Sequence, residues 1–506
     1  MRFSSRYGVL AVACAASLLI LGPLAALDVN AQQSSGETPS TELSASAPKD
    51  FSVTIYNQNF GLVRDTRTIN LSNGVNYLRI GDVASQIDPT SVSFESTTAP
   101  NQVVVREQNY QYDLIDPNTI LRKSVGKTLK FRQYLQSGTV REITGTLLNS
   151  PEVTVADASG GNSMRYQGLV IRTADGIVLQ PDGVIEIAEL PPGLVSTPSL
   201  LWKLETTKSG THQTELRYQT AGMNWHADYV AVMNEADNGL DLTSWVTLDN
   251  KSGATYDNAA LKLMAGDVHR VQTRGSFAGG GGIMAMAESA PPPQFQEQSF
   301  AEYHLYTLQG KTTLRDNETK QMSLFNASNI PVKKLFVFDS NQNEMIPMEE
   351  SDGGSTTKSK VNVKIEVANS DANHLGMPMP KGKVRVYKKD ADGALQFIGE
   401  DEIDHTPRDE KIRLYIGDAF DVVGERKQVT QTRVSDHETR ETYEISIRNH
   451  KKTAAPVTII EHTWGDWKIV QQSHPSTRKD SRTFEFNIDV PANGEVKVNY
   501  TISIKN

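Results

Sequence analysis

Two short polar stretches carry residue types that could do chemistry. In the first, Gly399–His405, the acidic residues Glu400, Glu402 and Asp404 occupy alternate positions. On a β-strand these three carboxylates would share one face, each about 6.6 Å from the next. Two of them could just reach one hard cation such as calcium, but three in a line cannot close around it. The alternative is a solvated strand end, and we predict no metal there.

The second stretch is Trp464-Gly465-Asp466-Trp467, in which a Gly-Asp turn separates two tryptophans. Such a turn could present at least one ring to solvent beside the carboxylate of Asp466. Exposed aromatic rings beside a carboxylate are a plausible surface for stacking on sugars. The alternative is that both rings pack at the edge of a sandwich. Trp464, Asp466 and Trp467 are the candidate ligand-binding residues.

No recognised catalytic or cofactor motif accompanies these stretches. None of the ten histidines lies in an HExxH or similar metal-binding spacing. The sequence also contains no Gly-x-Ser-x-Gly elbow, phosphate-binding glycine loop or dinucleotide fingerprint. Lys389–Gly393 resembles the start of a calcium loop but lacks the third acidic ligand and the closing glutamate. We predict no catalytic residues, no metal and no cofactor.

The N-terminus has the pattern of an export signal. Arg2 and Arg6 precede an apolar run over 8–27, and 29–31 places small residues at the −3 and −1 positions of a cleavage site. An uncleaved membrane anchor is the alternative, although Gly22-Pro23 interrupts the run. Cleavage would give an exported protein, periplasmic or extracellular, without an integral membrane domain.

The single cysteine, Cys14, lies inside this leader. A cleaved chain would therefore contain no disulfide, no thiolate nucleophile and no cysteine-bound zinc. The formal net charge is −9, and no long basic run occurs. A mildly acidic chain of this kind argues against nucleic acid or an anionic membrane as the main partner.

Alternation of apolar and polar residues is the dominant pattern along the chain. It is clearest over 361–367, 484–490 and 496–504, and it is typical of strands with one face in a core. The best helix signal is Asp116-Pro117, a cap followed by a proline suited to the first helical position. The sequence predicts an all-β fold: two to three linked β-sandwich (immunoglobulin/fibronectin-like) domains with at most one or two short helices.

Composition suggests where these domains begin and end. The proline-rich segment 191–198 predicts a boundary, and the glycine- and proline-rich segment 274–302 and the polar segment 349–360 are expected to be mobile loops. The loop 274–302 is expected to interrupt one domain. The predicted parts are a signal peptide 1–31, a flexible spacer 32–49, an N-terminal β domain 50–198, a central β domain 199–428 and a C-terminal β-sandwich 429–506.

A weak internal echo links two distant segments. Asn250 ends one strand pattern and Gly266-Asp267 follows it by 16 residues, while Asn449 and Gly465-Asp466 repeat the same spacing. We interpret the echo as two related sandwich units. A coincidence of hairpins is the alternative.

Several ordered runs of residues resemble a known family. They are Asn224–Tyr229, Asn234–Asp237, Trp245–Ala254, Leu263–Val268, Gly382–Lys388, Asp404–Pro407 and Gly417–Arg426. Together they resemble the bacterial exported proteins of the domain-of-unknown-function 4139 family, distantly similar to the mucoidy-inhibitor A group. The resemblance covers 199–506, about 60% of the chain. It implies export and β architecture, and it supplies no catalytic residues.

We therefore predict an exported cell-envelope β-sandwich protein that is not an enzyme and acts by binding or scaffolding. Its expected partner is an envelope polysaccharide or another envelope protein. The alternative is a carbohydrate-active enzyme or hydrolase that acts on envelope polysaccharide. A cleft with two carboxylates about 5–10 Å apart and a raised pKa would favour the enzyme. A flat or filled surface would favour binding.

Overall fold

The computed structural model describes most of the chain after the leader. The predicted signal peptide lies outside the described residues, and so does most of the spacer, of which Leu43–Ser44 forms a short strand, β1. Within the described part, no helix is both long and apolar enough to cross a bilayer. The described ranges are 43–44, 50–135, 138–156, 162–269, 294–339, 350–351 and 354–505.

The predicted all-β class is confirmed, with 67% strand and 3% helix. In the described residues there is one α-helix, Pro117–Lys123 (α1), and it begins at the predicted cap. The Asp116 side chain accepts hydrogen bonds from the backbone N–H groups of Asn118 and Thr119. Two short 3-10 turns, Pro89–Ser91 (η1) and Asp371–Asn373 (η2), complete the helical content there.

The same four-strand arrangement occurs four times along the chain. In each copy the first strand pairs antiparallel with the fourth, and the second pairs antiparallel with the third. We call these copies units 1 to 4. Unit 1 comprises β3 (Phe60–Leu71), β4 (Gly74–Ile80), β14 (Ser199–Thr206) and β15 (Gly210–Ala221). Unit 2 comprises β17 (Gly239–Asn250), β18 (Tyr256–Ala265), β20 (Tyr303–Leu314) and β21 (Glu318–Asp339). Unit 3 comprises β23 (Gly354–Ala368), β24 (Gly382–Lys389), β25 (Leu395–Ile403) and β26 (Lys411–Ser435). Unit 4 comprises β27 (Glu438–Asn449), β28 (Ala455–His462), β31 (Thr483–Val490) and β32 (Gly494–Lys505).

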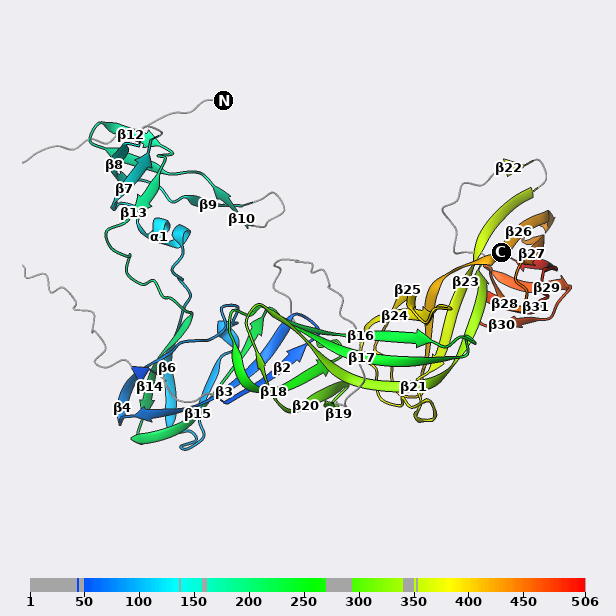
Figure 1. Ribbon diagram of the computed structural model, residues 1–506, viewed down its shortest axis with the longest axis horizontal. Helices are drawn as coiled ribbons and strands as arrows, with labels where there is room; N and C mark the ends of the chain where they lie inside the picture. The colour runs from blue at the N-terminus through cyan, green and yellow to red at the C-terminus, as the bar shows by residue number, and fades with distance from the viewer. Residues whose placement is uncertain are drawn as a thin grey trace, which may run out of the picture. The chain divides into compact units, whose positions relative to one another are not determined.

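Consecutive units share continuous strands. The first part of β21, a strand of 22 residues, pairs with β17, and its last part pairs with β23 of the next unit. Likewise β26, 25 residues long, pairs first with β23 and then with β27. β15 continues through Gly222 into β16 (Met223–Met233), which pairs with β17. We call β15–β16, β21 and β26 the linking strands; β21 and β26 are labelled in Figure 1.

Further strands extend the sheets of these units. They are β2 (Asp50–Tyr56), β5 (Ser93–Ser96), β6 (Val103–Gln111), β19 (Phe295–Phe300), β22 (Glu350–Ser351), β29 (Asp466–Gln472) and β30 (Ser476–Arg478). β2 pairs antiparallel with β3 and parallel with β18, so it joins the sheets of units 1 and 2.

A buried asparagine closes the first strand of units 2, 3 and 4. Asn250, Asn369 and Asn449 are each at most 3% exposed. In each, Nδ2 donates toward carbonyl oxygens of the following loop and of the connection between the third and fourth strands. The acceptors are Ala254, Leu314 and Arg315 for Asn250, Met377, Thr406 and Pro407 for Asn369, and Thr453, Val490 and Pro491 for Asn449. The asparagine part of the echo thus has a physical cause, since Asn250 and Asn449 make equivalent hydrogen bonds in two like units.

The expected boundary at 198/199 does not separate two domains. β14, which begins at Ser199, pairs with β4 on one side and β6 on the other. One hydrophobic core extends from Phe51 to Leu414, and a second extends from Phe336 to Ile504. The expected boundary at 428/429 falls inside β26. Both boundaries are therefore wrong, because strands and cores run across them.

The proline-rich segment instead marks the return of an insertion. Gln111 at the end of β6 is paired with Ser199 at the start of β14, so residues 112–198 leave and re-enter at directly opposite positions. The insertion contains α1, a five-stranded sheet and a β9–β10 hairpin. Its own core comprises Leu129, Phe131, Leu147, Leu169 and Ile171. Its strands are β7 (Thr128–Tyr134), β8 (Val140–Leu147), β9 (Glu152–Ala156), β10 (Asn162–Tyr166), β11 (Val170–Thr173), β12 (Gly176–Leu179) and β13 (Val184–Glu186).

The two segments expected as mobile loops are strands in part. In 274–302, Phe295–Phe300 forms β19, which among the described strands pairs with β20 alone and lies at the edge of its sheet. In 349–360, residues 350–351 form β22 and residues 354–360 belong to β23. The sequence missed β19 because only one of its six residues is buried, which leaves no alternating pattern. The other residues of the two segments lie outside the described residues, except for short flanks of β19. β18 and β20, on either side of 274–302, pair directly.

Candidate functional site

Three of the family-like runs meet on neighbouring strands. β24, β16 and β17 lie side by side in one sheet, where Asp228 is paired with Lys383 on one side and with Trp245 on the other. Along β16 the odd-numbered residues are buried, so strand alternation turns His226 and Asp228 to the outer face. Residues more than 150 positions apart in the chain are therefore adjacent on this face.

Asp228 is the centre of a group of polar side chains that we call the His226–Asp228 cluster: His226, Asp228, Thr247, Arg385 and Glu400. The Asp228 Oδ2 atom accepts a hydrogen bond from Thr247 Oγ1 at 2.6 Å and lies 3.2 Å from His226 Nε2. Its Oδ1 accepts from Arg385 Nη1 at 3.3 Å. The Arg385 Nε atom also lies 3.7 Å from Glu400 Oε2, so one guanidinium lies between two carboxylates.

These contacts decide which charges the cluster carries. Burial by itself would raise the pKa of the Asp228 carboxyl, but hydrogen bonds from His226 and Thr247 and the charge of Arg385 outweigh it and lower that pKa to about 2. The hydrogen bond to Asp228 raises the pKa of His226, against the opposing effect of partial burial. Because Asp228 stays ionised at neutral pH, it suits electrostatic binding better than general-acid catalysis.

Aromatic rings adjoin the cluster. Trp245, opposite Asp228 on β17, is half-buried. On β24, Tyr387 follows Arg385 by two residues, and its ring packs edge-to-face against Phe397 with 5.7 Å between ring centroids. Phe397 is 55% exposed. The face thus combines aromatic surface with mutually paired charges, a combination that suits a polar ligand with apolar ring faces.

The sequence did not single out this cluster. The sequence signal that could have indicated part of the cluster is the alternation within 223–233, which places His226 and Asp228 on one face. Arg385 lies 157 residues from Asp228 in the chain, and no local pattern indicates such a partner.

The acidic stretch 400–405 makes contacts with neighbouring strands. Glu400 Oε1 lies 3.4 Å from Lys383 Nζ, and Glu402 Oε1 lies 3.5 Å from Lys381 Nζ. Asp401 Oδ2 accepts a hydrogen bond from the backbone N–H of Tyr415 at 2.7 Å. These carboxylates therefore face ammonium and amide groups of the protein. Within the described ranges, no three His, Cys, Asp or Glu side chains are grouped so that they could hold a metal ion.

His405, at the end of that stretch, joins distant parts of the chain. Its Nδ1 accepts a hydrogen bond from the backbone N–H of Lys381 at 3.1 Å, and its Nε2 lies 3.1 Å from the side-chain amide of Asn57, 348 residues away. Because Nδ1 accepts, a neutral ring carries its proton on Nε2, whose neighbour at 3.1 Å is the amide nitrogen Nδ2 of Asn57. Turning this amide by 180° would bring its oxygen to the same place as the acceptor for that proton. Burial lowers the pKa of His405, which favours this neutral form.

The two candidate tryptophans have opposite environments. Trp464 is 51% exposed, whereas Trp467 is 7% exposed and belongs to the core of unit 4. Trp467 Nε1 donates to the carbonyl of Ser481 at 2.6 Å, and its ring packs against Phe484 at a centroid distance of 5.2 Å. Asp466 is exposed at the start of β29. The prediction of a ligand role is therefore wrong for Trp467, because its ring is enclosed in this core, whereas Trp464 precedes β29 and is outside the strand. Trp464 and Asp466 remain at the surface.

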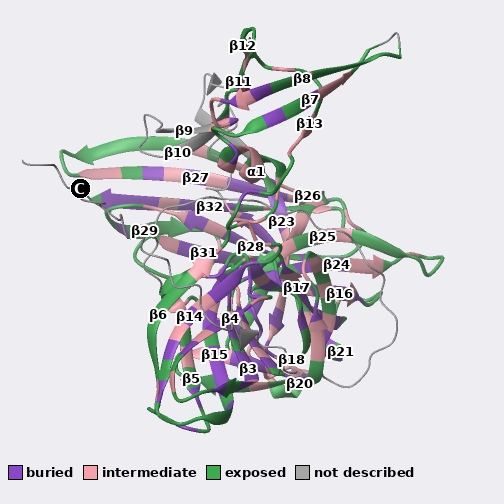
Figure 2. Cartoon of the chain, turned by 90° about the vertical axis from the view of Figure 1, so that its left-hand side faces the viewer, coloured by how far each residue is buried: buried purple, intermediate pink, exposed green. Residues whose placement is uncertain are grey.

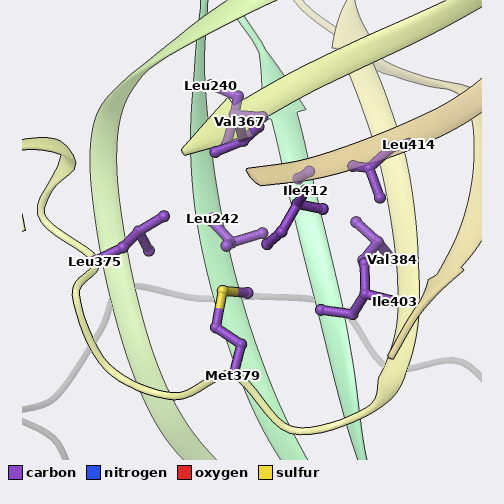
Figure 3. A pocket seen from close by; sticks show the side chains of 10 residues that line it. Leu240, Leu242, Val367, Leu375, Met379, Val384, Ile403, Ile412 and Leu414 are labelled. Carbon is purple, nitrogen blue, oxygen red and sulfur yellow. The ribbon is translucent and has the colours of Figure 1, made fainter. Parts of the chain in front are cut away.

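A small cavity lies in the shared core of units 2 and 3. Its volume is about 20 Å³, and Figure 3 shows its side chains pointing toward one another. This is room for about one water molecule, and every lining side chain is apolar, so the cavity is a packing void. The lining residues are Ala231, Leu240, Leu242, Val367, Leu375, Met379, Val384, Ile403, Ile412 and Leu414.

No family model matches the chain, and no curated protein matches it. The candidate site is therefore defined by its geometry.

Proposed function

We propose that the chain is an exported cell-envelope protein that acts by binding or scaffolding, and that the outer face around the His226–Asp228 cluster binds an envelope polysaccharide. The observation that carries this proposal is the joint presence, on one sheet face, of accessible aromatic rings and charges that already neutralise one another. Sugar rings stack on aromatic side chains through their C–H faces and offer hydroxyl groups to paired charges. The leader pattern in residues 1–31 supports the envelope location.

The direction of the carboxyl pKa shifts favours binding over hydrolysis. A carboxyl that protonates a glycosidic oxygen needs a raised pKa. In the described part of the chain, every carboxyl whose pKa is displaced has it lowered. These carboxyls belong to Asp116, Asp228, Asp237, Glu366, Asp390, Asp418, Glu438 and Asp480.

The linking strands support the scaffolding part of the proposal. Units connected by a loop can change their relative orientation at the loop. Units that share a strand are connected by the hydrogen bonds that this strand makes to both of them, and these bonds resist such a change. β21 is hydrogen-bonded to β17 and β23, and β26 to β23 and β27. Such joints suit a protein that holds a surface in a fixed register for its ligand.

Affinity electrophoresis of the mature protein through gels containing envelope polysaccharide tests the proposal. Phe397→Ala should weaken retention by about two- to tenfold, the worth of one aromatic stacking contact. Phe300→Ala is the matched control, because Phe300 is 54% exposed and lies on β19, which belongs to a different sheet from the cluster.

Equal retention of the two variants and the parent protein would contradict the assigned face. Release of new reducing ends from the polysaccharide would favour the hydrolase in its place. Arg385→Ala should also weaken retention if the paired charges contact the ligand.

A further inference from the structure

The insertion 112–198 leaves and rejoins the sheet of unit 1 at paired positions. Its ends leave from Gln111 and Ser199, which already face each other across an antiparallel pair. A two-residue turn would join such positions. A segment that is inserted between two paired strands, and that has its own core, suggests a role beyond the folding of those strands.

The insertion also exposes an unusual share of apolar side chains. Of the 24 large hydrophobic residues that are exposed among the described residues, 11 lie between Tyr112 and Leu190. Two of them, Ile177 at 62% and Leu179 at 70% exposure, are on β12. Figure 2 shows β12 largely in the colour of exposed residues.

β12 is an open sheet edge. In the described part of the chain it pairs with β11 and with no other strand. Its hairpin closes with a two-residue turn between Thr173 and Gly176, so these two form the hydrogen-bonded pair. The next pair, Arg172 and Ile177, then directs its backbone groups away from each other. The backbone N–H and C=O groups of Ile177 therefore face the open edge.

Side chains give this edge a preferred partner. Ile177 and Leu179 share the face opposite Val178, which packs on the core of the insertion. Arg172, directly paired with Ile177, lies on the same face. No carboxylate of the described residues lies within ion-pair distance of Arg172. The face thus offers two apolar side chains and one cation that has no counter-charge among the described residues.

We infer that the open edge of β12 is a docking site for an extended segment of a partner polypeptide. The segment adds a strand beside β12 and places apolar side chains against Ile177 and Leu179, with a carboxylate near Arg172. An unpaired strand edge is complementary to another strand and to no other backbone conformation.

A second copy of this chain is a poorer occupant. Pairing two β12 strands across a two-fold axis would bring both Arg172 guanidiniums to one small surface and add like-charge repulsion. Only four residues per copy would pair. The surface buried by so short a pair would be far smaller than the roughly 800 Å² per partner that a stable dimer buries.

Fluorescence anisotropy with the full mature protein tests the inference. The probe is a labelled heptapeptide, Glu-Thr-Val-Thr-Val-Thr-Glu, which as a strand places both valines and both glutamates on one face. We expect saturable binding that weakens with salt, and about tenfold weaker binding when both glutamates are replaced by lysine. Ile177→Asp should lower the affinity by about tenfold or more.

Val184→Asp is the matched control, because Val184 is 56% exposed on β13, the opposite edge of the same sheet. It adds the same charge and should leave binding unchanged. Arg172→Gln provides a second variant that spares the backbone and should remove the preference for glutamate over lysine. Absence of saturable binding, equal losses in the two aspartate variants, or equal affinity for both peptides would overturn the inference. Self-association abolished by Ile177→Asp would identify a second copy as the occupant and would also overturn it.

Discussion

Trp464 and Trp467 lie three residues apart in the chain, but Trp464 is exposed and Trp467 is buried. The enclosed ring of Trp467 contacts Phe484, and the guanidinium of Arg478 lies 4.4 Å from its centroid. Trp467→Ala should lower the free energy of unfolding by about 3–5 kcal/mol, while Trp464→Ala, at an exposed position, should change it by less than about 0.5 kcal/mol. Urea denaturation of both variants measures the contrast. Similar values for the two would place Trp467 outside the core.

His226 and Asp228 predict a pH dependence with a definite sign. The pKa of His226 is raised in the folded state, so its stabilisation is fully present below the ordinary value of 6.5 and is lost as pH rises through the raised pKa. The pKa of Asp228 is lowered, so its stabilisation is present above 3.8 and is lost as pH falls toward about 2. Both contributions are therefore present together between 3.8 and 6.5.

Asp228→Asn weakens the hydrogen bond that raises the pKa of His226 and removes the negative charge that adds to this effect. NMR titration of the His226 ring in this variant should show a lower pKa than in the parent protein. Urea denaturation at pH 5.5 and at pH 8.5 should also show a smaller difference between the two conditions. An unchanged His226 titration would mean that the pair does not form in solution.

At the scale of elements, each buried asparagine connects two loops of its unit by hydrogen bonds. Asn449→Ala leaves the carbonyls of Thr453, Val490 and Pro491 without their donor, and unpaired buried polar groups of this kind cost about 1–3 kcal/mol. Asn499→Ala is the control in the same unit, because Asn499 is exposed on β32. Chemical denaturation should separate the two variants. A loss confined to Asn499→Ala, or equal losses, would show that this connection does not depend on the amide.

The insertion allows a prediction about a whole segment. Replacing 112–198 by Asn-Gly joins β6 to β14 through a turn suited to a hairpin. Because Gln111 and Ser199 already face each other, the thermal midpoint of the remaining chain should move by only a few degrees. Circular dichroism and calorimetry measure this. Loss of the cooperative transition would mean that the insertion supports the fold of unit 1.

At the scale of the whole molecule, two linking strands meet at one glycine. A Cβ atom on Gly424 of β26 would collide with the ring of Phe338 on β21. Gly424→Ala should therefore destabilise the core that contains Phe338 by about 1–3 kcal/mol, and calorimetry should show a lower transition temperature than in the parent protein. Adding Phe338→Leu should restore part of the loss by vacating space. A loss that the second change deepens would mean that the clash is not the cause.

The sequence could predict features that depend on neighbouring residues in the chain, and it could not predict contacts between residues that are far apart in the chain. Alternation over 484–490 corresponds to β31, and the Asp116-Pro117 cap to α1, because such patterns depend on neighbours in the chain. Partnerships such as Asn57 with His405 depend on residues hundreds of positions apart.

The incorrect domain boundaries have the same origin. Proline-rich composition at 191–198 marks the end of a segment, but it does not indicate whether that segment is a domain or an insertion between paired strands. A strand that serves two units has no compositional change at the point where it passes from one to the other, and β26 crosses the expected boundary at 428/429 for this reason.

The linking strands restrict how the length of the gene can change. Since side chains alternate with period two, one codon added within β21 before residue 332 would turn every later side chain of the strand over and direct Phe336 and Phe338 away from the core that they share with unit 4. A codon added to the exposed hairpin loop 390–394 would disturb only that loop. Mutation by insertion and deletion should therefore be tolerated in hairpin loops and in 112–198, while selection should remove odd-numbered length changes from the linking strands.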